Sequence, residues 1–458
     1  MGHGSHLGEE HRALADRLQH GSVAMVEPAD LTCKAAWGEI LETLFTPEDA
    51  VLASKLPILP TPLASIADRL GTDPDSLGSR LDELANKGLV MDFPHPRTGE
   101  MLYLLAPPMV GLYEFSMMRV SDHLPKEKVA NAFGSYLRAE EFVEELSAGA
   151  TVMGRALAYE TVLFDDLLSE VLDWERASFV VESAGKVSIT NCACRHKASH
   201  VGTVCDAPLE TCMSLGPAAD YLIRRGLARE ISSQQGLEVL AAARDRGLVH
   251  IADNVQQDVS YICSCCSCCC EELRSVRAEH SVVVPSGFEA LIDAPSCNGC
   301  GRCVKRCPVE AISLVDRSVA QAAEREAETG RRTPSSVSAY DGGLDETPDG
   351  NSGRPLAVVN HDRCIGCGVC VGTCNRGALA LHRRAKQRHV PVNLVEFLTR
   401  SMIERGRLAD LIVDGTNGRG PAFANAVLRT VLSLPVADRI VASEQLQSRF
   451  VRFALSRA

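Results

Sequence analysis

Apolar residues recur at helical spacing along residues 30–105, and short polar breaks divide this pattern into elements. The stretch "AAWGEILETLF" has the apolar period of one helix. The stretch that follows predicts two further helices around a turn at Gly71, a stop at Gly88 and then two short strands. Asp73 or Asp75 is the expected cap of the second of these helices. The expected core positions are Leu63, Ile66, Ala67, Leu70, Leu77, Leu81, Leu84, Leu89 and Val90.

Most of the remaining chain also has helical spacing. Residues 106–190 predict a mainly helical region that ends in "ASFVVESAGKVSIT", a stretch with strand character. Residues 213–255 and 391–458 again predict helices, whereas residues 317–355 are charged and rich in Gly, Pro and Ser. Such a composition indicates a flexible insertion or a partner-facing loop. The pattern as a whole predicts an α+β, mainly helical multidomain protein.

Residues 30–105 resemble a winged helix in their order of helix, turn, helix and hairpin. A winged helix suggests DNA binding, but phosphate contact needs Lys and Arg. The expected recognition helix at 73–87 carries more acidic than basic residues: Asp73, Asp75, Asp82 and Glu83 against Arg80 and Lys87. We therefore expect a docking or packing module, and no nucleic acid as a partner.

Composition and charge agree with that expectation. The chain has 458 residues, of which 45% are hydrophobic, and a formal net charge of −12. An acidic balance argues against general nucleic-acid binding. The N-terminus has no basic region followed by an apolar one, and no stretch approaches about eighteen uninterrupted apolar residues. We expect a soluble, cytoplasmic protein without a membrane span.

The cysteines are concentrated in one part of the chain. Of 19 cysteines, all but Cys33 lie between Cys192 and Cys374. A secreted disulfide scaffold would be short and would carry an export signal. Thiolate ligation of a soft metal in a reducing compartment fits this chain better. Cys33 is expected to be a small buried hydrophobe.

Two cysteine runs share one spacing. "CNGCGRCVKRCPVEAI" has the pattern C-x2-C-x2-C-x3-C-P, and "CIGCGVCVGTCNRGAL" repeats the spacing with Asn375 in place of the proline. Four thiolates at these intervals suit a [4Fe–4S] cluster, and the glycines between them let the backbone come close. A zinc site would instead show paired C-x2-C knuckles. The eight cysteines are Cys297, Cys300, Cys303 and Cys307 in the first run and Cys364, Cys367, Cys370 and Cys374 in the second.

Both runs resemble those of the bacterial two-cluster ferredoxins, over about residues 290–385. In that family the fourth cysteine of each run ligates the other run's cluster. The resemblance implies one cluster held by Cys297, Cys300, Cys303 and Cys374. It implies a second held by Cys364, Cys367, Cys370 and Cys307, in one fold with pseudo-twofold symmetry. The insertion between the runs is longer than in a minimal ferredoxin and is expected to loop out.

The stretch "YICSCCSCCC" is the densest in sulfur. In steps of three it contains Cys263, Cys266 and Cys269, interleaved with Cys265 and Cys268, while Cys270 is left over. Neighbouring side chains point in different directions, so these thiols predict two separate sites. Four upstream cysteines raise the local total to ten: Cys192, Cys194, Cys205 and Cys212. One or two additional iron–sulfur clusters in 192–270 are expected, with disulfides, core packing and zinc as alternatives.

Four polar residues near these cysteines have two interpretations each. Arg195 and His196 follow Cys194, and either they hydrogen-bond to cluster sulfur or a bound anion, or they form a surface pair. His200 and His250 are either ligands or structural histidines, and the structural role is favoured. No nicotinamide, nucleotide or haem motif is recognisable, and a flavin site without a motif stays open.

The cysteine-rich segment and the two runs together resemble a group of anaerobe-associated multi-cluster 4Fe–4S proteins with a winged-helix N-terminus. The expected organisation is a polar extension at 1–29, a winged-helix-like domain at 30–105, a helical connection at 106–190, a cysteine-rich iron–sulfur domain at 191–280, a two-cluster ferredoxin domain at 281–390 with the flexible insertion 317–355, and a helical C-terminal region at 391–458.

Three functions fit these observations. The first is an electron-transfer protein or subunit that serves redox partner proteins, an electron donor and an acceptor, within or outside a larger oxidoreductase complex. The second is a reductase whose substrate binds an unusual iron–sulfur site in 192–270. The third is a redox-sensing winged-helix regulator. The first is favoured because the chain shows cluster ligands and no recognisable substrate site.

Overall fold

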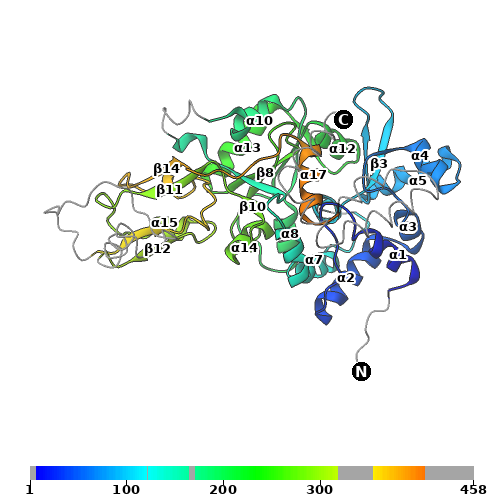
Figure 1. Cartoon of the computed structure of the whole chain (residues 1–458), viewed down its shortest axis with the longest axis horizontal. Coiled ribbons are helices and arrows are strands. Elements are labelled where there is room, and N and C mark those ends of the chain that lie inside the picture. Colours follow the sequence, from blue (N-terminus) through cyan, green and yellow to red (C-terminus); the bar gives the residue numbers. More distant parts are fainter. Residues whose placement is uncertain (1–6, 121, 164–170, 318–353, 408–458) are drawn as a thin grey trace. The chain divides into compact units, whose positions relative to one another are not determined.

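The computed structural model describes residues 7–120, 122–163, 171–317 and 354–407, and Figure 1 labels many of their helices and strands. The chain divides into two compact units. The first unit comprises Met1–Val152, Lys186–Ser232 and Pro391–Ala458, and the second comprises Met153–Gly185 and Ser233–Val390. Most of the expected insertion at 317–355, and the expected helix "AFANAVLRTVLSL", lie outside the described residues.

The first unit begins with three short helices, α1 (Glu9–Arg17), α2 (Leu31–Leu44) and α3 (Pro47–Ala53). Asp30 caps α2 because its carboxylate accepts the backbone N–H groups of Thr32 and Cys33. Leu14 of α1 is fully buried. Part of the expected polar extension at 1–29 therefore packs into the core of this unit.

Residues 61–105 form the two helices and the two strands after Gly88 that the pattern predicts, and also a short first strand that it did not predict. The helices are α4 (Leu63–Leu70) and α5 (Pro74–Lys87), and the strands are β1 (Thr61–Pro62), β2 (Val90–Pro94) and β3 (Met101–Leu105). Asp73, one of the two expected caps, accepts the backbone N–H of Ser76 at 2.9 Å. Gly71 and Gly88 end the two helices in the left-handed region, at φ +67° and +79°. Of the expected core residues, Leu63 and Leu70 are only half-buried.

The rest of the first unit is a mixture of helices and strands. The helices are α6 (Tyr113–Met118), α7 (Lys126–Tyr136), α8 (Glu140–Ser147), α11 (Ala193–His200), α12 (Gly216–Arg224) and α17 (Leu394–Glu404). Strands β5 (Val187–Asn191), β6 (Glu210–Leu215) and β7 (Arg229–Ile231) pair antiparallel, with β5 between the other two. The helical prediction for 213–255 was therefore incomplete, because it missed strands in that range.

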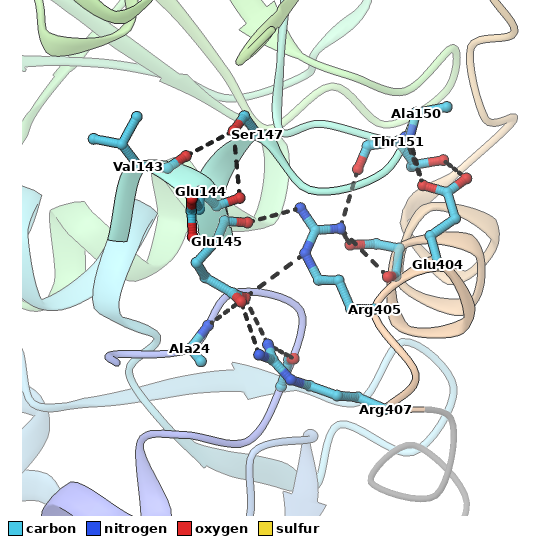
Figure 2. A network of polar contacts seen from close by, with 12 residues as sticks. Ala24, Val143, Glu144, Glu145, Ser147, Ala150, Thr151, Glu404, Arg405 and Arg407 are labelled. Carbon is cyan, nitrogen blue, oxygen red and sulfur yellow. Dashed lines mark hydrogen bonds and ion pairs between the residues drawn. The ribbon is translucent and has the colours of Figure 1, made fainter. Parts of the chain in front are cut away.

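The chain beyond α17 is tied back to α8 by charged groups (Figure 2). Arg407 donates to both carboxylate oxygens of Glu145 at 2.6 and 2.8 Å, and Glu145 also accepts the backbone N–H of Ala24. Glu404, at the end of α17, accepts the backbone N–H groups of Ala150 and Thr151. These contacts join segments from three parts of the sequence within the first unit.

The second unit contains strands of one larger sheet and two separate two-stranded antiparallel sheets. Strand β10 (Val283–Val284) runs parallel to β4 (Gly154–Leu157), and β8 (Val249–Asp253) pairs antiparallel with both β4 and β9 (Tyr261–Cys265). The helices of this unit are α10 (Ala177–Ser183), α13 (Ser233–Asp245), α14 (Glu271–Arg277) and α15 (Arg302–Arg306). The expected strand character of 177–190 was wrong for Ala177–Ser183, which is the helix α10 and buries Ala177, Val180 and Val181.

Two further structural findings bear on the sequence predictions. Gly247 lies after α13 at φ +71°, so the chain leaves the helix there in the left-handed region. Among the described residues, no helix combines the length and the apolar character that crossing a lipid bilayer requires.

Candidate metal centres

The two cysteine runs lie between four strands that interlock. The first run lies between β11 (Phe288–Ile292) and β12 (Ile312–Val315), and the second between β13 (Leu356–Val359) and β14 (Leu379–Arg383). Strand β11 pairs antiparallel with β14, and β12 pairs antiparallel with β13. The strand before each run thus pairs with the strand after the other run. Figure 1 shows β11, β12, β14 and α15 gathered together.

One cavity of this region is lined by cysteines from both runs. Its wall contains the thiols of Cys307, Cys364, Cys367 and Cys370, together with apolar side chains such as Val309 and Leu381. Burial, and then the nearby thiols of Cys307 and Cys364, raise the pKa of the Cys367 thiol. The fourth cysteine of the first run therefore lies with the first three of the second, as crossed ligation requires.

The other four thiols of the two runs differ in their exposure to solvent. Burial, followed by the neighbouring Cys297 and Cys300, raises the pKa of the Cys303 thiol to about 11. Cys300 is exposed, Cys297 is buried, and Cys374 is half-buried. A raised pKa disfavours the free thiolate, but a bound metal reverses this effect and deprotonates a coordinating thiol. Buried thiols grouped in this way therefore fit a soft metal core.

Two glycines hold the cysteine loops against neighbouring backbone. Gly366 has φ +66°, and a Cβ there would lie 2.0 Å from the carbonyl oxygen of Phe288. Gly299 has φ +68°, and its Cβ would lie 2.1 Å from the carbonyl oxygen of Pro355. Any side chain at either position would clash with backbone and would also be strained. Each loop consequently keeps its close approach to a neighbouring chain segment.

The dense stretch 261–270 divides its thiols into two groups. The Sγ atoms of Cys266, Cys268 and Cys269 lie within 4.8 Å of one another. In a second group, the thiols of Cys265 and Cys270 and a carboxylate oxygen of Glu272 also lie within 4.8 Å of one another. The division differs from the series of three read from the sequence, because β9 ends at Cys265 and the chain then turns before α14.

The Cys263 thiol lies next to a member of the second group, Cys265. Cys263 lies two residues before Cys265 on β9, and residues at that interval point to the same face of a strand. Hydrogen bonds with Cys263 and Cys270, followed by burial, raise the pKa of the Cys265 thiol well above its usual value. Two thiols and one carboxylate are thereby in reach of a shared ion, and the Cys263 thiol lies beside Cys265.

Glu272 is a candidate ligand that the sequence interpretation missed. It lies in the first turn of α14, after Cys270, which immediately precedes that helix. The signal was present in the sequence as "CCCEE", where two carboxylates directly follow the cysteines. A search restricted to thiols passes over such a residue, although carboxylate oxygen is also a metal ligand.

The four upstream cysteines lie in the first unit. Cys192 and Cys194 begin α11, Cys212 lies on β6, and Cys205 lies in the loop between these elements. A hydrogen bond with Cys194, together with burial, raises the pKa of Cys192 well above its usual value. These cysteines are expected cluster ligands on sequence grounds.

The polar residues around them are buried. Arg195 donates to the Thr211 hydroxyl at 2.7 Å and to the Pro208 carbonyl, and His196 Nδ1 lies 2.6 Å from the Met117 carbonyl. A surface Arg–His pair was thus the wrong interpretation, because both side chains lie in the interior. His250 is also buried, which lowers its pKa to about 4.

The disulfide alternative can be tested directly, since every cysteine lies in the described part of the chain. None of the 19 cysteines forms a disulfide, and this includes the neighbours in 261–270. Cys33 is half-buried and its thiol donates to the carbonyl of Ser135 at 3.6 Å. Burial raises the pKa of this thiol.

Comparison with known proteins agrees with this geometry. The family described as "4Fe-4S dicluster domain" matches residues 296–379. "Putative ferredoxin-3" of Sinorhizobium fredii (strain NBRC 101917 / NGR234) is 37% identical over 100 residues, which cover 22% of this chain and 81% of that protein. No solved structure matches the chain. The interlocked cysteine runs and these similarities together show that the chain belongs to the 4Fe-4S dicluster ferredoxins.

Proposed function

We propose that the protein is an electron-transfer protein or subunit that exchanges single electrons with partner oxidoreductases. The carrying observation is the cavity that Cys307 shares with Cys364, Cys367 and Cys370. In this proposal Cys297, Cys300, Cys303 and Cys374 hold one [4Fe–4S] cluster, and Cys307, Cys364, Cys367 and Cys370 hold the other. Such a cluster supplies reversible one-electron chemistry, with a potential set by its hydrogen bonds and its exposure to solvent.

The surroundings of the two runs give them different roles. Cys367 and Cys370 are 6% and 7% exposed, and apolar side chains surround them, so water is kept from this site. Cys300 is exposed, and the exposed basic residues Arg302, Lys305 and Arg306 follow it along α15. We therefore place electron exchange with a partner at the Cys300 side, with an acidic surface on the partner. Opposite charges would speed and orient that encounter.

The ten cysteines of 192–270 extend this proposal with one or two further clusters. The division of the thiols of 261–270 into two groups within the second unit supports this extension. In the first unit, the winged-helix-like domain at 30–105 serves as a docking or packing module. The acidic face of α5, which carries Asp75, Asp82 and Glu83, disfavours nucleic acid as its partner.

A second candidate function rests on Glu272. An iron held in part by a carboxylate exchanges this ligand more readily than a thiolate, because soft thiolates suit iron–sulfur centres better. The Cys265, Cys270 and Glu272 group could then admit a small substrate, which makes the protein a reductase supplied by the ferredoxin domain. A substrate-dependent change in the paramagnetic signal of one cluster would distinguish this function from electron transfer alone.

Iron and sulfide counting is the first test of the proposal. Protein purified without air should hold at least about twelve irons per chain, which corresponds to three or more cubane clusters. Cys300→Ala and Cys367→Ala should each lose a cluster, whereas Cys33→Ala should keep the full iron content. A count that stops at about eight irons would confine the redox chemistry to the ferredoxin domain.

Electron transfer itself is tested with the reduced protein. The fully reduced chain is mixed anaerobically with a panel of candidate redox partners, and its reoxidation is followed by visible absorption. Reoxidation by one partner should slow at high salt if charge guides the encounter. Complete reduction with no transfer to any partner would overturn the proposal.

A further inference from the structure

A second cavity of the second unit lies beside the ferredoxin strands and contains no cysteine. It has a volume of about 180 Å³ and lies between β4, the start of β11 and the chain after β14. Ligand pockets for drug-sized molecules are larger, at about 300–1,000 Å³. The cavity therefore suits a small molecule rather than a dinucleotide.

The charges around this cavity are unusual for an acidic protein. Four of its lining residues are Lys or Arg and two are Asp or Glu: Arg155, Arg384, Lys386 and Arg388 against Glu175 and Asp362. Arg383 binds Glu175 at 2.9 and 3.0 Å and so neutralises it. The whole chain, by contrast, has a formal net charge of −12. The lining thus concentrates positive charge at one place.

Arg155 is the most informative of these residues. It lies on β4 and is 2% exposed, and its Nε donates to the carbonyl of Asp253 at 3.0 Å. Its guanidinium carbon lies 5.2 Å from the centre of the Trp174 ring, which also lines the cavity. Its Nη2 is buried and has no hydrogen-bond partner among the residues that the structure describes. A buried cationic donor left in this way is costly unless a ligand satisfies it.

Arg155 keeps its positive charge at neutral pH although it is buried. Burial lowers its pKa to about 10, so the guanidinium remains protonated at neutral pH. Two further positive charges lie at the rim of the cavity, where Lys386 and Arg388 are exposed. The buried Arg155 would orient a bound anion, and Lys386 and Arg388 at the rim would attract the anion from solvent.

We infer that this cavity binds a small oxyanion, a molecule that carries a carboxylate or phosphate group, with Arg155 Nη2 as its buried donor. Guanidinium groups match the geometry of carboxylate and phosphate oxygens, which supports this class of ligand. Trp174 provides an apolar surface for the remainder of such a molecule.

The cavity is coupled to the second cysteine run through hydrogen bonds. Ser286 lines the cavity, and its hydroxyl donates to the carbonyl of Gly366 at 2.8 Å. Arg384 also lines it and donates to the carbonyls of Cys364 and Phe288. A bound anion would therefore lie near the loop that carries Cys364 and Cys367. Its negative charge would favour the oxidised state of a redox centre there.

Calorimetric titration of the full chain, purified anaerobically, tests the inference with inorganic phosphate and separately with acetate, at constant ionic strength. Saturable binding of phosphate alone indicates a phosphate-bearing ligand, and binding of acetate alone indicates a carboxylate. Arg155→Gln should lower the affinity for the anion about tenfold or more, because the variant loses a hydrogen bond to a charged group. Arg155→Lys should retain more affinity, because it keeps the charge.

Rim variants keep the test valid if Arg155→Gln does not fold. Lys386→Gln combined with Arg388→Gln should weaken binding about two- to fivefold, as expected for exposed charges. The control is Arg246→Gln, an exposed arginine of the same unit outside the cavity lining, which should leave the affinity unchanged. Absence of saturable binding of both anions, or equal affinity of the wild type and the rim double variant, would overturn the inference.

Discussion

Cys307 and Cys364 line one cavity although they belong to different cysteine runs. The register of the strands explains this proximity. Ile312 of β12 pairs with Val359 of β13, and Cys307 precedes Ile312 by the same interval at which Cys364 follows Val359. Antiparallel pairing therefore brings the two cysteines to the same end of the ladder.

The second ladder repeats this relationship. Ile292 of β11 pairs with Leu379 of β14, and Cys297 and Cys374 stand at the same interval beyond that pair. The backbone hydrogen bond from Asp293 to Ala378 corresponds to the one from Asn360 to Ala311. The expected exchange of fourth ligands thus has a physical basis in the register of both ladders.

Double variants can separate crossed from uncrossed ligation by iron content alone. If ligation is crossed, Cys307→Ala with Cys367→Ala removes two ligands of one cluster, and the protein should lose about four irons. Cys300→Ala with Cys307→Ala removes ligands of both clusters, so the loss should be about eight irons. Uncrossed ligation predicts the reverse order of the two losses. Iron and sulfide assays of the two proteins, prepared in parallel, decide between these outcomes.

Replacing Glu272 should change the iron content or the spectrum of one metal centre and leave the other centres unchanged. Glu272→Gln replaces an anionic oxygen by a neutral amide, which is a poorer metal ligand. We expect loss of iron from one centre, or a changed paramagnetic spectrum of that centre, with the other signals kept. Glu272→Cys offers a thiolate in its place and should restore the iron content.

The control for this prediction is Glu279→Gln. Glu279 is exposed and binds Arg363, outside either thiol group. Its replacement should leave the iron content and every spectrum unchanged. Identical spectra for Glu272→Gln and the wild type would show that the carboxylate only lies near the thiols.

The ferredoxin ligands could be predicted from the sequence because their spacing is local. Three thiols at intervals of three residues fit around one metal core whatever the rest of the fold does. The thiols of 261–270 could not be grouped in this way. Their division depends on where β9 ends and how the chain turns before α14, and the contribution of Glu272 depends on the start of that helix.

Helix ends were predicted better than short strands. Asp73, Gly71 and Gly88 act through their own backbone and side chain, so a single sequence reveals them. Strands β6 and β8 are short and buried on most positions, and such runs lack the alternation that distinguishes a strand from a helix. The helix Ala177–Ser183 was misread for the same reason, since its β-branched valines suggest a strand.

His250 should make the stability of the protein sensitive to acid. Burial lowers its pKa from 6.5 to about 4, so the folded protein keeps this imidazole neutral. Its stabilising effect is complete above about pH 6.5 and is lost as the pH falls toward 4, because the unfolded chain binds the proton first. Each pH unit within this window corresponds to about 1.4 kcal/mol.

His250→Phe removes the titrating group and keeps a ring beside Tyr159, whose ring centre lies 5.3 Å from that of His250. The thermal unfolding midpoint of the wild type should therefore fall further than that of the variant as the pH falls from 7.5 to 5.5. The half-exposed His280 is the matched control, and His280→Phe should keep the acid sensitivity of the wild type. An equal loss of stability in His250→Phe and wild type would contradict the prediction.

Replacing the buried Glu145 should strongly destabilise the fold of the first unit. Glu145 is 9% exposed, and its carboxylate binds Arg407 and lies 3.7 Å from the Nε of Arg405 (Figure 2). Glu145→Ala leaves the buried Arg405 without its counter-charge, and removing one partner of a buried pair costs about 3–5 kcal/mol. Glu83→Ala breaks an exposed ion pair with Arg80 and should cost less than about 1 kcal/mol. Urea unfolding of both variants, followed by far-UV circular dichroism, measures the difference, and equal midpoints would show that α17 is held by packing instead of charge.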